Sequence, residues 1–376
     1  MFDNRDFDGW AGSYDSDVRE SAQRYPFAGY EELMGRIAAR IIEKRRGGAP
    51  VSVFDLGCGT GVLASRLAEA GCTVMGVDFS AEMLAEAARR CPSLRPIRAD
   101  FSAGLPDGLG GGFDAVTCTY AIHHLSTPQQ ARLLRECLGV LRPGGEVIVG
   151  DVAFETPRDL ALCREQAGEE WDEDENYPVA EALRAWFPSL AFEPIPPCAG
   201  IITLAPAART LDAAALFPGF DARLLRERDV PEALELCRGN GDYYAFMRSE
   251  PSAEALLADT LALPPGKGLE DKYFLLLRDE AGPLGLADII SGYPDAGTAW
   301  IGLFMLRRSG RGRGLGRRMA LPLLAGLKTA GFSRAGLAWV RDNPVPARFW
   351  PSLGFVPEGA PRPCGEYELV TAYRAL

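Results

Sequence analysis

The chain has 376 residues, more than one hydrophobic core usually supports, so the sequence predicts two domains. Hydrophobic residues make up 47% and charged residues 24%, which are globular values, and both halves are therefore expected to fold. A formal charge of -11 would repel a phosphate backbone, which disfavours nucleic acid as the main partner.

The cysteines and the apolar runs exclude further classes of protein. Nine cysteines are scattered without a CxxC pair, so neither a disulfide framework nor a metal site is expected. The acidic, aromatic N-terminus is unlike a secretory signal, and no apolar run approaches the length of a membrane span. We expect a cytoplasmic enzyme that does not bind membranes; the sequence leaves its oligomeric state undetermined.

In the first half, short β-rich runs alternate with amphipathic stretches of helix length. An amphipathic helix is expected first, over residues 30–45. Strands are then predicted at residues 51–56, 73–78, 95–100, 113–120 and 146–151, with candidate helices such as 81–90 and 128–141 between them. This alternation predicts a Rossmann-like, doubly wound and mainly parallel sheet. Helical stretches at 158–170 and 179–186 are placed to cap an active site.

An Ala/Pro-rich stretch separates the two patterns. We place a first domain at residues 1–207, a linker at 208–218 and a second domain at 219–376. In the second domain, the predicted elements are a strand at 222–225, helices at 230–238 and 253–261, strands at 273–278, 285–290 and 299–307, a helix at 314–330 and a strand at 335–340.

The first candidate site is a glycine-rich turn between a strand and a helix. Asp55 is followed by Gly57, Gly59 and Gly61, and Asp78 lies seventeen residues further on, at the end of the next predicted strand. Glycines let backbone N–H groups approach a nucleoside-bearing ligand, and a carboxylate so placed can accept both ribose hydroxyls. The alternative is a tight structural turn, with Asp78 as the N-cap of a helix.

This D-x-G-x-G-x-G pattern resembles class I S-adenosylmethionine (SAM)-dependent methyltransferases more than the G-x-G-x-x-G of nicotinamide-binding proteins. The resemblance extends through residues 113–120 and 141–145. It implies SAM as cofactor. By resemblance, the SAM-binding residues are Asp55, Gly57, Cys58, Gly59 and Gly61 around the methionine part, Asp78 and Phe79 at the ribose and adenine, Asp100 and Phe101 at the adenine amino group, Tyr120, and Tyr14 in an N-terminal lid over residues 7–15.

The chain's two histidines, His123 and His124, directly follow the strand that ends at Tyr120. The carboxyl end of that strand should face the transferred methyl group, where a neutral imidazole can accept a proton from the methyl acceptor. Both histidines are therefore candidate catalytic residues. The alternative is that one bonds a loop and the other packs, because methyl transfer can also proceed by positioning alone.

The second candidate site joins an apolar strand to a helix through arginines and glycines. Six arginines lie between residues 307 and 318. Backbone N–H groups in such a turn, at the N-terminus of a helix, can bind a pyrophosphate. The turn comprises Arg311, Gly312, Arg313, Gly314, Leu315 and Gly316. A solvated loop or a nucleic-acid patch is the alternative.

This R-x-x-G-x-G turn resembles the acetyl-CoA loop of GNAT N-acetyltransferases, which implies a mixed, mostly antiparallel α/β domain. By resemblance, the further acetyl-CoA contacts are Leu303, Met305, Asn343 and Phe349. Trp350 stands where many members have a tyrosine acid, and an indole N–H is no acid at working pH. Asp288 is the candidate base, with a satisfied carboxylate as the alternative. Asn240, Asp242, Tyr243 and Tyr244, in an expected loop, could line the acceptor pocket or simply pack.

The function expected from these two sites is a bifunctional transferase. It would methylate small molecules with SAM and acetylate an amine with acetyl-CoA, one reaction in each domain. One alternative keeps the methyltransferase and makes the second domain a module that only binds or senses acetyl-CoA. Another directs both activities at protein or RNA, and the acidic charge argues against RNA.

Overall fold

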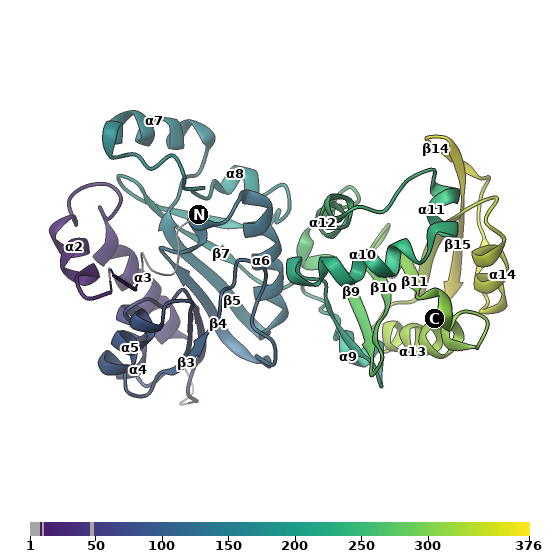
Figure 1. Cartoon of the computed structure of the whole chain (residues 1–376), viewed down its shortest axis with the longest axis horizontal. Coiled ribbons are helices and arrows are strands. Elements are labelled where there is room, and N and C mark those ends of the chain that lie inside the picture. Colours follow the sequence, from purple (N-terminus) through teal and green to yellow (C-terminus); the bar gives the residue numbers. More distant parts are fainter. Residues whose placement is uncertain (1–7, 10, 46–48) are drawn as a thin grey trace. The chain divides into compact units, whose positions relative to one another are not determined.

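The computed structural model describes residues 8–9, 11–45 and 49–376. The chain divides into two compact units, Met1–Pro206 and Ala207–Leu376 (Figure 1). Phe7 and Trp10, which belong to the expected N-terminal lid, lie outside the described residues. No helix in the described ranges combines the length and the apolar character that crossing a bilayer requires.

The first unit is built on a mixed sheet, which has seven strands within the described residues. Its order is β3-β2-β1-β4-β5-β7-β6, and β7 runs antiparallel to both of its neighbours. The order reverses between β1 and β4, and ligands of open α/β sheets bind at the carboxyl ends of the strands at such a point. The strands are β1 Ser52–Leu56, β2 Thr73–Asp78, β3 Arg95–Arg98, β4 Phe113–Thr119, β5 Leu141–Val152, β6 Ala191–Ile195 and β7 Ala199–Leu204.

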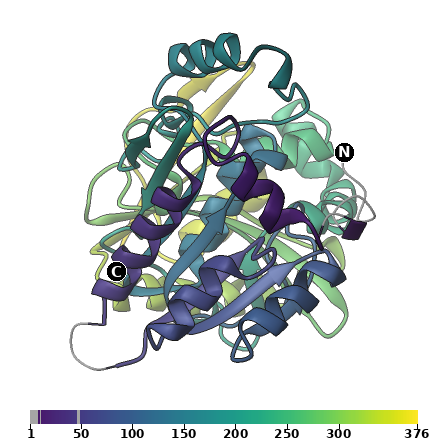
Figure 2. The same cartoon turned by 90° about the vertical axis from the view of Figure 1, so that its left-hand side faces the viewer.

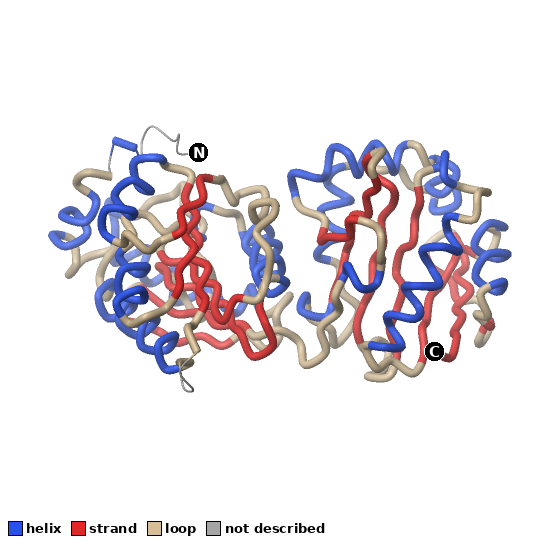
Figure 3. Tube along the Cα trace, turned by 90° about the horizontal axis from the view of Figure 1, so that it is seen from below, coloured by secondary structure: helices blue, strands red, loops and turns tan. Residues whose placement is uncertain are grey.

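Helices cover both faces of this sheet (Figures 1 and 3). On one face, α3, α4 and α5 pack against alternate strand residues such as Val53, Ala115 and Ile148. Figure 2 shows α3, in purple, in front of the strands of the first unit. The helices are α2 Tyr14–Glu20, α3 Tyr30–Glu43, α4 Val62–Glu69, α5 Ala81–Arg90, α6 Thr127–Gly139, α7 Pro157–Ala167 and α8 Ala180–Leu183, with 3-10 turns η1 Ile122–His124 and η2 Gly168–Glu170.

The second unit, all of which is described, has an eight-stranded sheet in the order β13-β15-β12-β11-β10-β9-β8, with β14 beside β15. Within residues 207–376 only β11 and β12 pair in parallel, so the sheet is mixed and mostly antiparallel. The strands are β8 Asp221–Leu224, β9 Lys272–Asp279, β10 Gly282–Ser291, β11 Thr298–Leu306, β12 Arg334–Val340, β13 Val356–Pro357, β14 Arg362–Cys364 and β15 Tyr367–Ala375.

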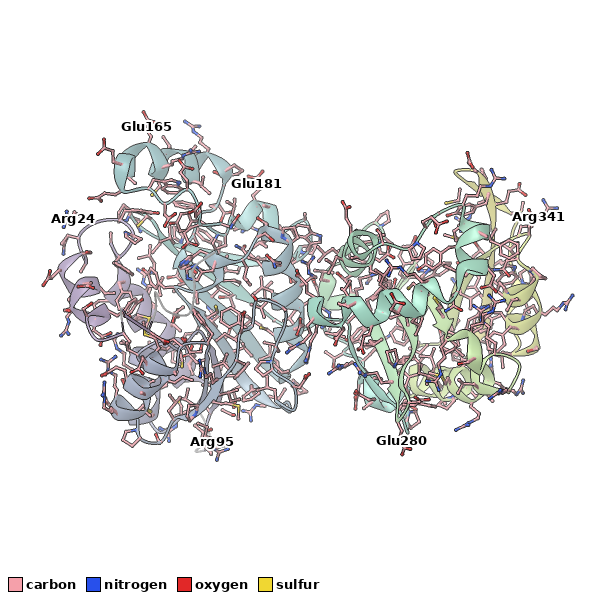
Figure 4. All side chains as sticks on the ribbon, viewed as in Figure 1. Arg24, Arg95, Glu165, Glu181, Glu280 and Arg341 are labelled. Atoms are coloured by element: carbon pink, nitrogen blue, oxygen red, sulfur yellow. The ribbon has the colours of Figure 1, made fainter. Side chains whose placement is uncertain are left out.

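Alternate residues of β9 divide the second core between two layers of helices (Figure 3). Leu275 and Leu277 pack with α13, whereas Phe274 and Leu276 pack with α10 and α12. Charged side chains such as Glu280 and Arg341 project from the surface (Figure 4). The helices are α9 Ala213–Leu216, α10 Val230–Arg238, α11 Gly241–Met247, α12 Ala253–Leu261, α13 Leu315–Thr329 and α14 Pro344–Ser352, with 3-10 turns η3 Glu227–Asp229, η4 Leu269–Asp271 and η5 Arg308–Gly310.

Two segments differ from their expected conformation. Residues 208–218, expected as a linker, contain α9, and Leu211, Leu216 and Phe217 are buried in the core of the second unit. The linker was expected because the stretch is rich in alanine and proline, and its three large apolar residues were not taken as a sign of burial. Within residues 240–244, expected as a loop, Asn240 is the N-cap of helix α11 and the other four residues form its start.

Candidate functional site

The glycine turn that follows β1 has a backbone that favours glycine. Gly57, Gly59 and Gly61 have φ values of +66°, +51° and +79°, in the left-handed region. A Cβ at Gly57 would lie 2.5 Å from the Cβ of Ala121, so tight packing alone requires this glycine. A Cβ at Gly59 would meet no described atom within 4 Å. The backbone at Gly59 therefore faces open space, into which a ligand can approach.

Asp78 ends β2 beside this turn. Its buried carboxylate accepts the N–H of Gly59 at 3.0 Å and the N–H of Ser80 at 2.9 Å. Burial raises the pKa of Asp78, although these N–H groups act in the opposite direction. The N-cap of α5 is Ser80, whose Oγ accepts the N–H of Met83 at 3.1 Å, so Asp78 is not the cap. The half-buried Phe79 lies between them in the chain.

Asp55 is fully buried near the end of β1. The hydroxyl of Thr117 donates to its Oδ1 at 2.7 Å, whereas its Oδ2 has no hydrogen-bond partner among the described residues. Burial raises the pKa of Asp55 to about 7. An orphaned buried acceptor is uncommon and fits a donor group supplied by a ligand.

The side chain of Cys58 packs locally, and that of Asp100 accepts a hydrogen bond within a turn. A Cβ at Gly76 would lie 2.8 Å from Sγ of Cys58, so this buried side chain points toward β2, and any contact with a cofactor would be through its main chain. Asp100 is exposed, and its Oδ1 accepts the N–H of Ser102 at 2.8 Å. Phe101 is buried, with its ring 3.6 Å from the position of a Cβ at Gly57. Phe101 thus reaches the glycine turn.

The helix α2 is fastened to the same turn. The hydroxyl of Thr60 donates to Asp15 at 2.7 Å, and Arg90 pairs with Asp15 while donating to the carbonyl of Thr60 at 3.0 Å. Tyr14 is half-buried and meets Phe27 edge-on, with ring centroids 6.3 Å apart. Burial, followed by nearby phenols and carboxylates, raises the pKa of Tyr14. Its place next to Asp15 brings it to the glycine turn, and its contact with SAM stays a prediction.

Tyr120 directly follows β4 in a strained conformation. Its φ is +50°, which is rare for a residue with a side chain and is often found at functional sites. The rings of Tyr30 and Phe27 lie 5.2 and 5.7 Å from its ring. Its buried hydroxyl has no hydrogen-bond partner among the described residues. A tyrosine with a strained backbone and a hydroxyl free of hydrogen bonds to the described residues therefore lies at the carboxyl end of β4, where the strand order reverses.

His123 lies one short turn further along the chain and is oriented by Asp151 at the end of β5. Its Nδ1 lies 2.6 Å from Oδ1 of Asp151, whose carboxylate is fully buried. Burial opposes the imidazolium, but the charge and hydrogen bond of Asp151, together with the charges of Glu175 and Asp172, outweigh it and raise the pKa of His123. Because Nδ1 donates its hydrogen to Asp151, Nε2 of the neutral ring carries the lone pair and can accept a proton or bind a cation.

A second carboxylate joins the two histidines. Nδ1 of His124 lies 3.0 Å from Oε2 of Glu175, and Nε2 of His123 lies 4.0 Å from the same oxygen. Tyr177 borders this group, with its ring 5.7 Å from that of His123. The sequence prediction missed Asp151 and Glu175. Asp151 ends the strand beside β4, which was an available signal, whereas nothing local indicated Glu175.

The matched family model lies within the first unit. Residues 53–145 match the family described as methyltransferase domain. Over 195 residues the chain is 30% identical to an uncharacterised methyltransferase of Oceanobacillus iheyensis, a match that covers 50% of this chain and 87% of that protein. The chain belongs to the class I SAM-dependent methyltransferases. In this methyltransferase unit, the open backbone at Gly59 and the orphaned Oδ2 of Asp55 fit bound SAM, which would supply an electrophilic methyl group.

Solved structures also resemble parts of the chain. The magnesium protoporphyrin IX methyltransferase of Synechocystis PCC 6803, with bound S-adenosylhomocysteine (SAH), is 17% identical, with a TM-score of 0.41, covering 54% of this chain and 98% of that one. An acetyltransferase from Thermus thermophilus is 28% identical, with a TM-score of 0.35, covering 42% of this chain and 97% of that one.

In the second unit, the parallel strands β11 and β12 separate part-way along their length. They pair from Thr298 with Arg334 to Ile301 with Leu337, and within residues 207–376 no pairing between them continues beyond this point. The remainder of β11 stays paired with β10 on its other side. Main-chain groups of residues 302–306 are therefore left without a strand partner on the β12 side, and they can bind an extended ligand.

The arginine-glycine turn leads from β11 into α13. Gly312 and Gly314 have φ values of +72° and +76°, and a Cβ at either would meet nothing within 4 Å. Gly314 is the N-cap of α13, so the free N–H groups at the start of that helix, from Leu315 onward, lie beside an open turn. Arg311 donates to Asp242 at 2.6 Å, whereas Arg313 is exposed.

The residues proposed for acetyl transfer are tied into packing. Both oxygens of Asp288 accept from Nζ of Lys272 at 2.9 Å, and burial raises the pKa of Asp288 although Lys272 lowers it. Trp350 is buried, with its ring 5.2 to 5.6 Å from those of Phe355 and Phe304. The ion pair with Lys272 thus supports the alternative in which Asp288 is a satisfied carboxylate. The buried indole of Trp350, among aromatic rings, is suited to packing.

Further predicted acetyl-CoA contacts have structural roles. Asn343 is the N-cap of α14, with its Oδ1 accepting the N–H of Val345 at 3.1 Å. Phe349 lies 3.2 Å from the position of a Cβ at Gly316, so the start of α13 packs closely on α14. Leu303 and Met305 belong to the cluster on the α10 side of the sheet, together with Tyr243 and Tyr244. Their binding roles stay predictions.

Proposed function

We propose that the chain is a bifunctional transferase that methylates a small molecule with SAM in its first unit and acetylates an amine with acetyl-CoA in its second. Membership of the methyltransferase family gives neither the acceptor nor the second activity. The proposal adds both, a small-molecule acceptor for the methyl group and acetyl transfer in the second unit. Each half rests on its own cofactor site.

The observation that supports the methyl-transfer half is the open glycine turn beside Asp78, at the switch point of the sheet. The carboxyl end of β4 also brings Tyr120 and His123 to this switch point. Aromatic rings and the Asp151-oriented imidazole suit a small acceptor whose proton is removed during transfer. Both histidines are kept as candidate bases, and the contact with Asp151 favours His123.

The observation that supports the acetyl-transfer half is the separation of β11 from β12 next to the open turn at Gly314. Unpaired main-chain groups of β11 are suited to hydrogen-bonding an extended amide chain such as pantetheine. The N-terminus of α13, with its free N–H groups and the exposed Arg313, is suited to a pyrophosphate. Coenzyme A contains both of these chemical groups in sequence.

Calorimetric titration of the full chain with SAH and with coenzyme A tests the proposal. Asp78→Ala should weaken SAH binding on the order of 10- to 100-fold, because it removes charged hydrogen bonds, and should leave coenzyme A binding unchanged. Gly314→Glu should abolish coenzyme A binding only, because a carboxylate would repel the pyrophosphate. Each variant is thus the control for the other. An unmutated chain that fails to bind coenzyme A would remove the acetyltransferase half.

A second candidate function follows from Asp288 and Trp350. With the carboxylate engaged by Lys272 and the indole buried, the second unit has neither a free base nor a free acid at these positions. It would then bind or sense acetyl-CoA without transferring the acetyl group. Coenzyme A binding combined with no acetylation across a panel of amines would favour this candidate; acetylation of any amine would exclude it.

A further inference from the structure

His123, His124 and Glu175 bring three potential metal ligands to the carboxyl edge of the first sheet. One donor atom from each of them, two imidazole nitrogens and a carboxylate oxygen, lies within 4.8 Å of the other two. The side chains are 13%, 30% and 8% exposed, so the group is accessible without being a flexible surface cluster. The scattered cysteines had indicated no metal site, and this group contains no cysteine.

The spacing is near that of a tetrahedral site. Metal–ligand bonds of about 2.0 to 2.1 Å place the ligand atoms of a tetrahedral zinc roughly 3.3 Å apart. The measured separations are 3.0 Å from His124 Nδ1 to Glu175 Oε2 and 4.0 Å from His123 Nε2 to the same oxygen. Movements of less than an ångström would bring both pairs to the required distance.

Asp151 supplies an independent observation. Metal-binding histidines usually donate their second ring nitrogen to a carboxylate, which fixes the tautomer and orients the ring. Nδ1 of His123 makes such a contact with Asp151 at 2.6 Å, and this leaves Nε2, the atom nearer Glu175, to bind a cation. Asp151 is fully buried, and its Oδ2 has no hydrogen-bond partner in the described part of the chain.

We propose that His123, His124 and Glu175 bind a divalent cation of the zinc class and leave its fourth position for the methyl acceptor. Two imidazoles with one carboxylate form a donor set that zinc uses when one position stays open. An acceptor hydroxyl or thiol in that position would lose its proton to solvent as its oxygen or sulfur binds the cation, because the cation lowers the pKa of the bound group.

Cation binding excludes one role of His123. A cation on Nε2 occupies the lone pair that would otherwise accept a proton from the acceptor, so the histidine would hold the metal instead of acting as the base. The use of the cation in methyl transfer rests on the proposed function. Cation binding itself does not, and it is measured without any methyl acceptor.

The test is a titration of the full, chelator-treated and tag-free chain with Zn²⁺ alone. Cys364 is the exposed cysteine, so the titrations use a Cys364→Ser background that removes this competing thiol. We expect one equivalent of Zn²⁺ by calorimetry and by elemental analysis. Substitution with Co²⁺ should give the visible spectrum of a tetrahedral site without thiolate charge transfer.

Glu175→Gln should weaken Zn²⁺ binding by more than tenfold, and Asp151→Asn by about tenfold through the orientation of His123. Glu173→Gln is the matched control, because Glu173 lies on the same segment, is exposed and pairs with Arg164. The thermal unfolding transition checks that each variant is folded. Absence of Zn²⁺ binding, or equal binding by Glu175→Gln and Glu173→Gln, would overturn the proposal. Zn²⁺ binding by a chain that does not bind SAH would support the cation site and contradict the SAM site.

Discussion

The buried carboxyl of Asp55 should make the stability of the methyltransferase unit depend on pH. Its pKa is about 7 in the folded chain and 3.8 when unperturbed, so between these values the folded chain holds one proton more than the unfolded chain. The stability contributed by the protonated carboxyl is therefore fully present below pH 3.8 and is lost as the pH rises through 7.

The magnitude follows from the same two values. Each pH unit in this window lowers the free energy of unfolding by about 1.4 kcal/mol, and the loss between pH 5 and pH 7 is about 2 kcal/mol. No solvent screening reduces this figure, because Asp55 is fully buried. Asp55→Asn keeps an oxygen that accepts from Thr117 and does not titrate. The stability of the variant relative to the unmutated chain should therefore rise by about 2 kcal/mol between pH 5 and pH 7.

Urea unfolding followed by pulsed hydrogen exchange on peptides of β1 and β4 measures the first unit separately from the second. The same substitution at the exposed Asp100 is the control for the exchange of a carboxylate for an amide. A difference between Asp55→Asn and the unmutated chain that stays constant from pH 5 to pH 7 would refute the reasoning, because it would mean that Asp55 is already ionised in the folded chain at pH 5.

Three further predictions concern the proposed SAM site and the ion pair of the second unit. Gly59→Ala should cost about 1 kcal/mol in thermal unfolding, because φ is positive but no atom collides, and should weaken SAH binding at least tenfold; unchanged SAH affinity would contradict an open cradle. Lys272→Met should destabilise the second unit by about 3 kcal/mol in urea, with Asp288→Asn restoring most of the loss; no rescue would contradict the pairing. Arg90→Ala should weaken SAH binding about fivefold, because it releases α2 from the glycine turn. Arg89→Ala, which removes only the exposed ion pair with Glu86, should not weaken it. Equal effects of the two substitutions would contradict a role of the Arg90–Asp15 pair in holding α2 against the turn.

Local sequence features predicted the elements that carry the glycine turns. The predicted helix 81–90 and strand 73–78 have the observed bounds of α5 and β2, because amphipathic spacing and β-branched runs are local signals. Strands β6 and β7 were not predicted. Prolines at 194, 196 and 197 interrupt the alternation of apolar and polar residues in this region. The β7 strand is instead specified by its pairing with β5, which is distant in the sequence and gives no local signal.

The candidate site could be predicted only where its residues follow strand ends. Asp78 ends one predicted strand and His123 follows another, and the sheet order brings those strand ends to one edge. Glu175 follows no predicted strand, and it reaches His124 from 51 residues away in the sequence. The partner of Asp288 was missed for a similar reason, because Lys272 meets it only through the pairing of β9 with β10.

Native mass spectrometry of the full chain with SAH and coenzyme A together tests the central claim most directly. Two independent cofactor sites predict a species that carries one SAH and one coenzyme A at the same time. The coenzyme A adduct should disappear in Gly314→Glu, and the SAH adduct in Asp78→Ala. A chain that carries SAH but never coenzyme A, or that exchanges one for the other, would contradict two sites in two units.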